Sequence, residues 1–544
     1  MSFSEVYVRS GEIKDGDITM IKSEGNSVDR RDFLKIAAGS AAALVASAPK
    51  ADAQENSARP SNEQASEEAK KVDALATVRT PETPADNPYT QGMAAFVSGL
   101  RYEQIPQEVI DRIKLLMLDS LGCAIYGVDL EWSRILMRTL QQLDSSKSCG
   151  VWGTSLRLSA PHAALVNGTL VHGFELDDIH RLGVMHVGAV TLPSLLAVTE
   201  IRPGMSGRDF LTAAVAGYEI GPRVGRCMGE EHIGQGWHSA ATVGVFSSAA
   251  AAAAALRLSK EQTVHALGIA GTQSAGLMAA QYGSMVLRMH TGRSAQSGLY
   301  GGLLAANGFT GIVNVFESDY GGFCTTFSRS HDRFNLAELT SGLGARFETM
   351  QVSLKFYSCV SSNHTTLDAI RAIRARRPFS VDEVDHIVVH GSQVTVDHVG
   401  WKYRPAGVSA AQLNLPFCVA TLLLDGNVFV DQFTALKIVD PVRIALADKV
   451  KVVADPDITA RGSEFRQMVR AEVFLKDGTV LTETVETPRG SERSFASKAD
   501  VVEKFENLAG HVMPAGQVAA IRDAVLTLET LPDSSRLAHL LTKQ

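Results

Sequence analysis

The sequence predicts a mainly α-helical protein in which a large all-helical domain is interrupted by a smaller α+β lid domain. Apolar residues recur at helical spacing over residues 89–326, among long runs of Ala, Leu and Gly, which is typical of packed helices. After about residue 346, short β-branched runs alternate with helical segments, and helical spacing returns after about residue 490. We therefore place the helical domain at residues 87–345 and 491–544 and the lid domain at residues 346–490.

The N-terminal region predicts an export signal followed by a tether. Arg30 and Arg31 precede Phe-Leu-Lys, and a short apolar stretch then leads to an Ala-Asp-Ala site at residues 51–53. That order is typical of a twin-arginine signal peptide over residues 1–53, and the apolar stretch is shorter than the roughly 18 residues of a membrane span. Residues 54–86 are rich in Glu, Ser, Pro and Ala, which predicts a disordered linker. We expect a periplasmic or exported protein without a membrane span.

Several segments of the helical domain have clear helix signals. Ser206 and Ser259 are each followed three residues later by Asp or Gln, the pattern of a helix N-cap. An alanine run at residues 249–255 permits close approach of helices, and we interpret it as core. The predicted helices of this domain include residues 108–126, 210–221, 240–258 and 294–307.

The lid domain combines strands and helices. Its clearest element is a β-hairpin at residues 468–487, where two alternating runs flank the turn Asp477-Gly478. Other predicted strands lie at residues 384–390 and 450–453, and predicted helices at residues 366–376, 412–424, 497–510 and 516–529, the last two returning to the helical domain. A cleft between the two domains is the expected site of chemistry.

Composition excludes several classes of function. The net charge of −7 argues against nucleic acid as a partner. The six cysteines are scattered, without a C-x-x-C pair or zinc-like spacing. The sequence therefore predicts no metal site, and it offers no cysteine-held iron–sulfur cluster.

Residues 167–188 concentrate ionisable side chains in an otherwise apolar part of the chain. Buried charges and imidazoles are costly unless they are paired, so the cluster indicates a place where protons move; a solvated loop with chance histidines is the alternative. Two further histidine-bearing segments, around His238 and His290, favour the first interpretation. The residues of the cluster are His172, Glu175, Asp177, Asp178, His180 and His186.

Seven motifs in order resemble the MmgE/PrpD family, which includes 2-methylcitrate dehydratase, cis-aconitate decarboxylase and iminodisuccinate epimerase. They run from ALVNGTLVHGFELDDIH with MHVGAVTLPSLLAV, through AGYEIGPRVG, GWHSAATVG and RMHTGRSAQSGLYGGLLAANGFTG, to LKFYSCVSSNHTTLDAI, AAQLNLPFCVATLLLDG and PRGSERSFASKADVVEKF. The resemblance implies a homodimer without metal or organic cofactor. It also implies a small di- or tricarboxylate substrate, on which a proton is moved, or a group lost, beside a carboxylate.

The resemblance assigns candidate catalytic residues. His186 matches the active-site histidine of the family and is the best candidate for base or acid, since an imidazole can fill either role near neutrality. His238 matches a second pocket histidine, and Glu175 an acidic pocket position where Asp is usual. Asp178, with its neighbour Asp177, could orient an imidazole or cap a helix. His180 is a weaker candidate.

The resemblance also assigns substrate-binding residues. Lys355, Arg288 and His290 are the implied binding groups, of which the two cations suit a substrate carboxylate. The family lysine near Arg288 is replaced by Leu287, a pocket tyrosine by Phe417, and a pocket threonine by Ile179. These changes make the predicted pocket less polar, which favours a substrate with fewer carboxylates or a larger apolar part.

Three hypotheses follow. The leading one is a cofactor-independent lyase that dehydrates a small hydroxy-carboxylate, resembling 2-methylcitrate dehydratase, with His186 and His238 as acid and base. The alternative is a decarboxylase or epimerase of a related di- or tricarboxylate. The third is an exported carboxylate-binding protein without catalytic activity.

Overall fold

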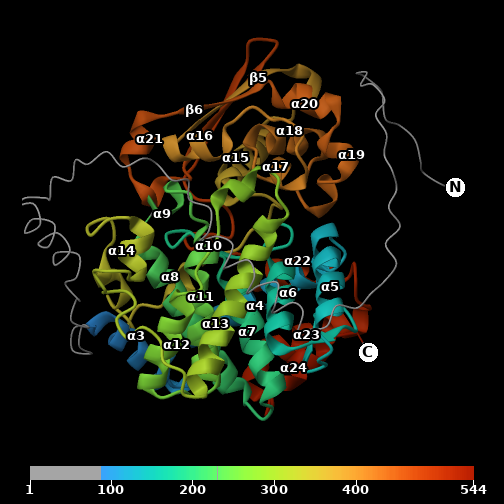
Figure 1. The fold of residues 1–544 in the computed structure, drawn as a ribbon. Helices are drawn as coiled ribbons and strands as arrows, with labels where there is room; N and C mark the ends of the chain where they lie inside the picture. Colours follow the sequence, from blue (N-terminus) through green and yellow to red (C-terminus); the bar gives the residue numbers. More distant parts are fainter. Residues whose placement is uncertain (1–86, 230, 544) are drawn as a thin grey trace, which may run out of the picture. The chain divides into compact units, whose positions relative to one another are not determined.

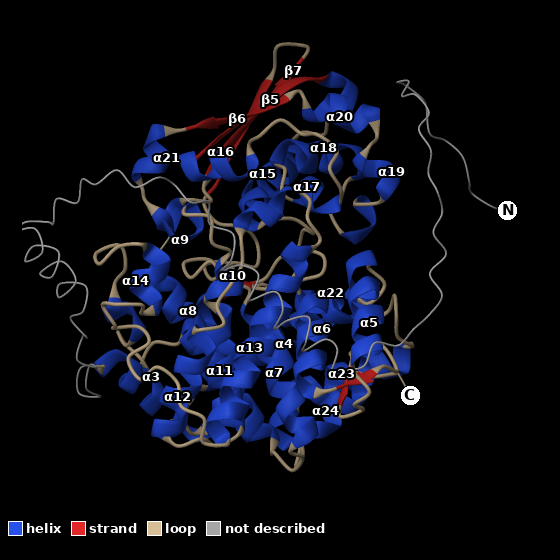
Figure 2. Ribbon diagram, viewed as in Figure 1, coloured by secondary structure: helices blue, strands red, loops and turns tan. Residues whose placement is uncertain are grey.

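The computed structural model describes residues 87–229 and 231–543, which belong to one compact unit, Pro81–Gln544. The predicted signal peptide and linker lie outside the described residues. Within the described part the chain is mainly helical with few strands (Figure 2), as the sequence predicts. No helix among the described residues is both long enough and apolar enough to cross a membrane.

The central helices pack closely because small residues line their contacts. Helix α13 (Val286–Ala306) lies against α6 (Ala160–Val171), α7 (Val187–Ile201) and α11 (Gly244–Ala255), and Figure 1 shows this group in the lower part of the view. A Cβ on Gly292 of α13 would lie 2.0 Å from the carbonyl oxygen of Leu165 on α6. Only glycine therefore permits this helix crossing.

Other helices complete this region. Ser206 caps α8 by accepting from Asp209 N at 3.2 Å, and Ser259 forms a capping box with Gln262 at the start of α12. Both match the predicted helix starts. The remaining α-helices of this region are α3 (Pro88–Gly99), α4 (Gln107–Gly127), α5 (Glu131–Leu143), α8 (Gly207–Met228), α9 (Glu231–Gly234), α10 (Ser239–Thr242), α12 (Lys260–Gly271), α14 (Phe323–Ser328), α22 (Lys498–Ala509), α23 (Ala515–Leu526) and α24 (Ser535–Leu540).

A four-stranded sheet has the order β6-β5-β7-β8. Strand β5 (Val384–Gly391) pairs parallel to β6 (Val450–Ala454) and antiparallel to β7 (Val469–Leu475), which forms the predicted hairpin with β8 (Val480–Val485). Residues of β7 alternate between buried and half-buried, the pattern of a sheet with one face covered. The helices that contact the four-stranded sheet are α15 (His364–Arg376), α16 (Gln393–Val399) and α18 (Leu415–Asp425).

The buried apolar residues form two clusters that meet beside residues 167–188, the segment with many ionisable side chains. The first contains residues 93–354 and 496–541; the second contains residues 357–475 together with a few residues from the helical region. Phe174 and Leu176 belong to the second cluster, so they anchor the loop that carries Glu175 between the two cores. Strand β3 (Ile179–His180) then pairs with β4 (Val352–Ser353), which holds the same loop against the chain that leads to Lys355.

Candidate active site

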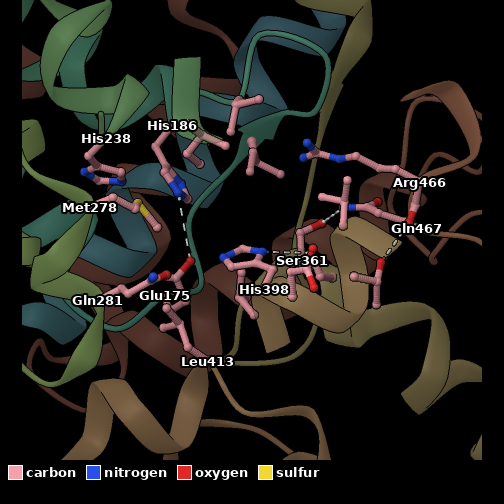
Figure 3. Close-up of a pocket in the computed structure, with 18 of the residues that line it drawn as sticks. Glu175, His186, His238, Met278, Gln281, Ser361, His398, Leu413, Arg466 and Gln467 are labelled. Carbon is pink, nitrogen blue, oxygen red and sulfur yellow. Dashed lines mark hydrogen bonds and ion pairs between the residues drawn. The ribbon is translucent and has the colours of Figure 1, made fainter. Parts of the chain in front are cut away.

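A cavity of about 350 Å³ lies where the two clusters meet (Figure 3). Its volume is at the lower end of the range for small-molecule sites, roughly 300–1,000 Å³. Its walls come from segments far apart in the sequence. The lining residues are His172, Glu175, Ile179, Val184, His186, Ile233, Gly234, His238, Met278, Gln281 and Leu287, with Val360, Ser361, Ser362, Val394, Thr395, Asp397, His398, Leu413, Arg466 and Gln467.

His186 is held in one tautomer. It precedes α7 as the N-cap residue, and its Nδ1 lies 2.9 Å from the backbone carbonyl oxygen of Asp178. A carbonyl oxygen only accepts hydrogen bonds, so Nδ1 carries a proton. Nε2 is then the nitrogen that can exchange a proton with a ligand, and it lies 3.9 Å from Oε1 of Glu175.

Asp177 supports two imidazoles at once. Its two carboxylate oxygens lie 3.1 Å from Nδ1 of His172 and 3.1 Å from Nδ1 of His186. Burial alone would raise the pKa of Asp177, but the two histidines lower it well below its usual range. Asp177 therefore stays ionised and stabilises positive charge on His186.

The same three residues are the one group in the described chain whose ligand atoms lie close enough, within 4.8 Å, to hold a metal ion. His186 Nδ1 donates to a carbonyl, and His172 Nδ1 bonds Asp177. A metal bound at the two Nδ1 atoms would have to displace these hydrogen bonds, because a nitrogen ligand must present a lone pair. The observed geometry fits a hydrogen-bonded network better than a metal centre.

Glu175 forms ion pairs with the two cations that the sequence predicts to bind the substrate. Its carboxylate lies 2.8 Å from Nζ of Lys355 and forms an ion pair with Arg288. Burial alone would raise the pKa of Glu175, but Lys355, His172 and Arg288 together lower it well below its usual range. Lys355 and Arg288 lie behind Glu175 rather than in the cavity lining, and Arg288 also donates to Gln412 at 3.0 Å.

The backbone of Glu175 is unusual for a residue with a side chain, because its φ is +57°. That region is sparsely populated by non-glycine residues, and strain of this kind persists where the surroundings impose it. Phe174 and Leu176, buried in the second cluster on either side, supply that constraint.

His238 and His290 form a pair that shares one proton. Their Nδ1 atoms lie 2.9 Å apart, so one donates and the other accepts. Burial lowers the pKa of both side chains, for His238 with a further contribution from His290. His238 lines the cavity and its ring lies 6.1 Å from that of His172, whereas His290 stands behind it.

Besides Lys355, Arg288 and His290, three more of the predicted site residues lie outside the cavity lining. His180 bonds Glu348 at 3.0 Å, and Phe417 packs on Tyr403 with ring centroids 4.4 Å apart. Asp178 accepts from Gly188 N at 3.0 Å in the first turn of α7 and from the hydroxyl of Tyr218 at 2.8 Å. The side chain of Asp178 thus caps the helix, and its backbone carbonyl orients His186.

The cavity also has walls formed by residues that the sequence did not predict. Met278 and Gln281 come from the turn before α13, and Ser361 and Ser362 precede α15. His398 from α16 and Arg466 and Gln467 before β7 complete the opposite side. Ser361 and Ser362 fall within the motif LKFYSCVSSNHTTLDAI, which was the available signal. The others are single residues without a surrounding pattern.

Comparison with known proteins defines the class. Residues 91–335 match the MmgE/PrpD N-terminal domain, and residues 357–530 match the MmgE/PrpD C-terminal domain. The chain therefore belongs to the MmgE/PrpD family, as its motifs predicted.

Its relatives are named for one reaction. The chain is 33% identical to the cis-aconitate decarboxylase-like protein oryM of Aspergillus oryzae, over 85% of this chain and 99% of the relative. It is 31% identical to cis-aconitate decarboxylase of Aspergillus terreus (86% and 98%) and 30% identical to that of Mus musculus (83% and 93%). These names describe carboxy-lyases, so they match the alternative hypothesis better than the predicted dehydratase.

Proposed function

We propose that this protein is a lyase that decarboxylates a small unsaturated polycarboxylate of the cis-aconitate type. The observation that carries the proposal is the single tautomer of His186, whose exchangeable nitrogen belongs to a side chain that lines the cavity. The names of relatives that match this chain over nearly their full length support decarboxylation over dehydration.

Decarboxylation needs one proton delivered to carbon. The bond to the leaving carboxylate breaks, CO₂ departs, and the bonding electron pair moves into the adjacent unsaturated system. A proton from Nε2 of His186 then adds to carbon, so that a carboxylate and a proton become CO₂ and a new C–H bond. Asp177 stabilises the imidazolium before transfer, and water restores the proton afterwards.

The low polarity of much of the lining supports the same reaction. Ile179, Val184, Leu287 and Leu413 line the same cavity as His186 and Glu175. A carboxylate carries concentrated charge, whereas CO₂ is neutral, so an apolar wall favours the product side of the step.

A screen of carboxylates tests the proposal. Purified protein is incubated with cis-aconitate, alkyl-substituted aconitates and 2-methylcitrate, while released CO₂ and proton NMR spectra are recorded. We expect CO₂ from an unsaturated substrate. Water loss without CO₂ would restore the dehydratase hypothesis, exchange at carbon alone would indicate epimerisation, and binding without turnover would favour the non-catalytic hypothesis.

We also propose that the protein is a homodimer. Val286, Tyr300 and Leu304 expose apolar side chains along α13, and exposed apolar patches commonly mark association surfaces. Light scattering at micromolar concentration should give twice the chain mass, and a Leu304→Glu variant should give the monomer mass if α13 forms the interface.

Export to the periplasm completes the proposal, on the basis of Arg30, Arg31 and the apolar stretch that follows. Fractionation of cells that express the full chain tests it, with Arg30→Lys/Arg31→Lys as the matched variant. We expect the variant to stay in the cytoplasm.

A further inference from the structure

Apolar side chains line part of the cavity near its reacting end. Leu287 and Leu413 are 3% and 4% exposed and belong to the lining. Leu287 directly precedes Arg288, which pairs with Glu175. Leu413 directly follows Gln412, which accepts from Arg288 at 3.0 Å. This part of the apolar lining therefore lies near the carboxylate of Glu175 (Figure 3).

Other apolar lining residues reach the protein surface. Val184, Ile233 and Met278 are half-buried, and Val394 of α16 is 45% exposed. The cavity thus offers apolar surface both beside the reacting end and at its mouth.

The charged lining residues outside the reacting end already have partners. Asp397 is exposed and accepts from Nε2 of Gln393 at 2.7 Å, and Arg466 has an interaction partner within the protein. An uncharged group can therefore enter this part of the cavity without leaving a buried charge unpaired.

The cavity is larger than cis-aconitate alone requires. Its volume of about 350 Å³ is the share of about twelve water molecules in the liquid, at roughly 30 Å³ each. cis-Aconitate has a similar number of non-hydrogen atoms, but covalent bonds hold these atoms closer together than water molecules lie. Space for further carbon atoms therefore remains beside such a ligand.

Val184 has a strained backbone at this wall. Its φ is +49°, in a region that β-branched residues rarely adopt. Two backbone hydrogen bonds between His180 and Met185, at 2.8 and 3.2 Å, close the turn that carries it. Strain of this kind persists where the surroundings impose it, and it clusters at ligand sites. Glycine would adopt this φ without strain, so the valine points to a use for its isopropyl group.

We infer that the apolar lining binds an aliphatic substituent of the substrate and that Val184 contacts this substituent. The inference rests on the proposed function for the reacting end, where the leaving carboxylate lies beside His186. From there the substituent extends toward Ile233, Met278 and Val394. The preferred substrate is therefore an alkyl-substituted relative of cis-aconitate rather than cis-aconitate itself.

Calorimetry with a series of alkylsuccinates, from methyl to hexyl, tests this binding without chemistry, because these compounds lack the double bond. Affinity should increase about fourfold with each added methylene until the space is filled. The heat-capacity change of binding should become more negative with chain length, as expected when apolar surface is buried. For turnover, kcat/KM of cis-aconitates with an alkyl group on the methylene carbon should increase in parallel. Affinity that does not depend on chain length would overturn the inference.

Val184→Thr tests the residue itself, since threonine keeps the branched shape and adds a hydroxyl. The gain in affinity per methylene should be smaller in this variant than in the wild type. Val480→Thr is the matched control, because Val480 is 49% exposed on β8 and lies outside the cavity lining. It should give the wild-type series. Identical series in Val184→Thr and wild type, or the same loss in both variants, would contradict the role of Val184.

Val184→Gly separates backbone strain from binding. Because glycine tolerates positive φ, the melting temperature should stay equal or rise while the dependence on chain length weakens. A lower melting temperature with an unchanged alkyl series would show that Val184 serves the fold alone. If the wild type binds longer alkylsuccinates more tightly but releases no CO₂ from any substrate, the proposed function fails and the assignment of the apolar lining stands.

Discussion

The two ends of the cavity differ in how their polar groups are satisfied. At the end with His186, nearly every charge has a partner: Glu175 has Lys355 and Arg288, and Asp177 has two histidines. On the opposite side, Gln467 and His398 keep buried atoms without partners among the described residues. The end with His186 also keeps a buried atom without a hydrogen-bond partner among the described residues, Nε2 of His172, but its charges are paired. Paired charges fix geometry and protonation for chemistry, whereas unpartnered polar atoms leave bonds for a ligand to make.

The largest effect should come from His186→Gln. Removal of a positioned acid–base group costs about 10²- to 10⁴-fold in kcat, so CO₂ release should fall by that factor while the melting temperature changes little. The control is His386→Gln, at a half-buried histidine on β5 that lies outside the cavity lining. Full activity of His186→Gln would break the comparison, because the networked end would then not be the reacting end.

Glu175→Gln should mainly cost stability. It leaves Lys355 and Arg288 buried without their anion, and a broken buried ion pair typically costs about 3–5 kcal/mol. The folded-state pKa of Glu175 is lowered, so its stabilisation is present above its unfolded pKa of about 4.3 and is lost as pH falls toward the folded value. Urea unfolding at pH 7 and pH 4 should therefore show a smaller difference between variant and wild type at pH 4.

Asp178→Asn should change how stability depends on pH. Burial raises the pKa of Asp178 to about 7, so its carboxyl binds a proton more tightly in the folded protein than in the unfolded chain. Its contribution is greatest below the unfolded pKa of about 3.9 and is lost as pH rises toward 7. The asparagine variant keeps an acceptor for Gly188 N, and its unfolding free energy should fall less than that of the wild type between pH 5 and pH 7.

His398→Leu should have the smallest effect at neutral pH. It removes a buried nitrogen without a partner among the described residues, so the unfolding free energy at pH 7.5 should change by less than about 1 kcal/mol. The folded-state pKa of His398 is about 4, below the unfolded value of about 6.5. The wild type therefore loses stability as the pH falls below about 6.5. At pH 5 the unfolding free energy of the variant should therefore rise relative to that of the wild type. A decrease in unfolding free energy of more than about 2 kcal/mol at pH 7.5 would show that the polar groups around His398 are as fully paired as those around His186.

Local signals predicted most elements of the fold. The amphipathic segment 108–126 is α4 (Gln107–Gly127), and the turn at Asp477-Gly478 joins β7 and β8. Residues 240–258, expected as one helix, form α10 and α11, which meet at Val243. The parallel pairing of β5 with β6 has no local signal, because it joins strands about sixty residues apart. The limits of the lid domain stay a prediction.

The site was predictable where residues cluster in sequence and obscure where they meet only in space. His186 and Glu175 belong to one short segment, and His238 carries a motif of its own. The pairing of Lys355 and Arg288 with Glu175 depends on how three distant segments pack, so the sequence alone predicts that both cations are available to the substrate. Arg466 is a single residue in a polar stretch, and only the fold brings it to the cavity.

Turnover in deuterated water tests the central claim most directly, namely that His186 Nε2 delivers the proton that forms the new C–H bond after CO₂ has left. NMR of the product and simultaneous CO₂ measurement should give one deuterium per CO₂ released, at a single carbon, with both signals reduced together in His186→Gln. Product without CO₂, or deuterium incorporation that is undiminished in His186→Gln, would contradict the account.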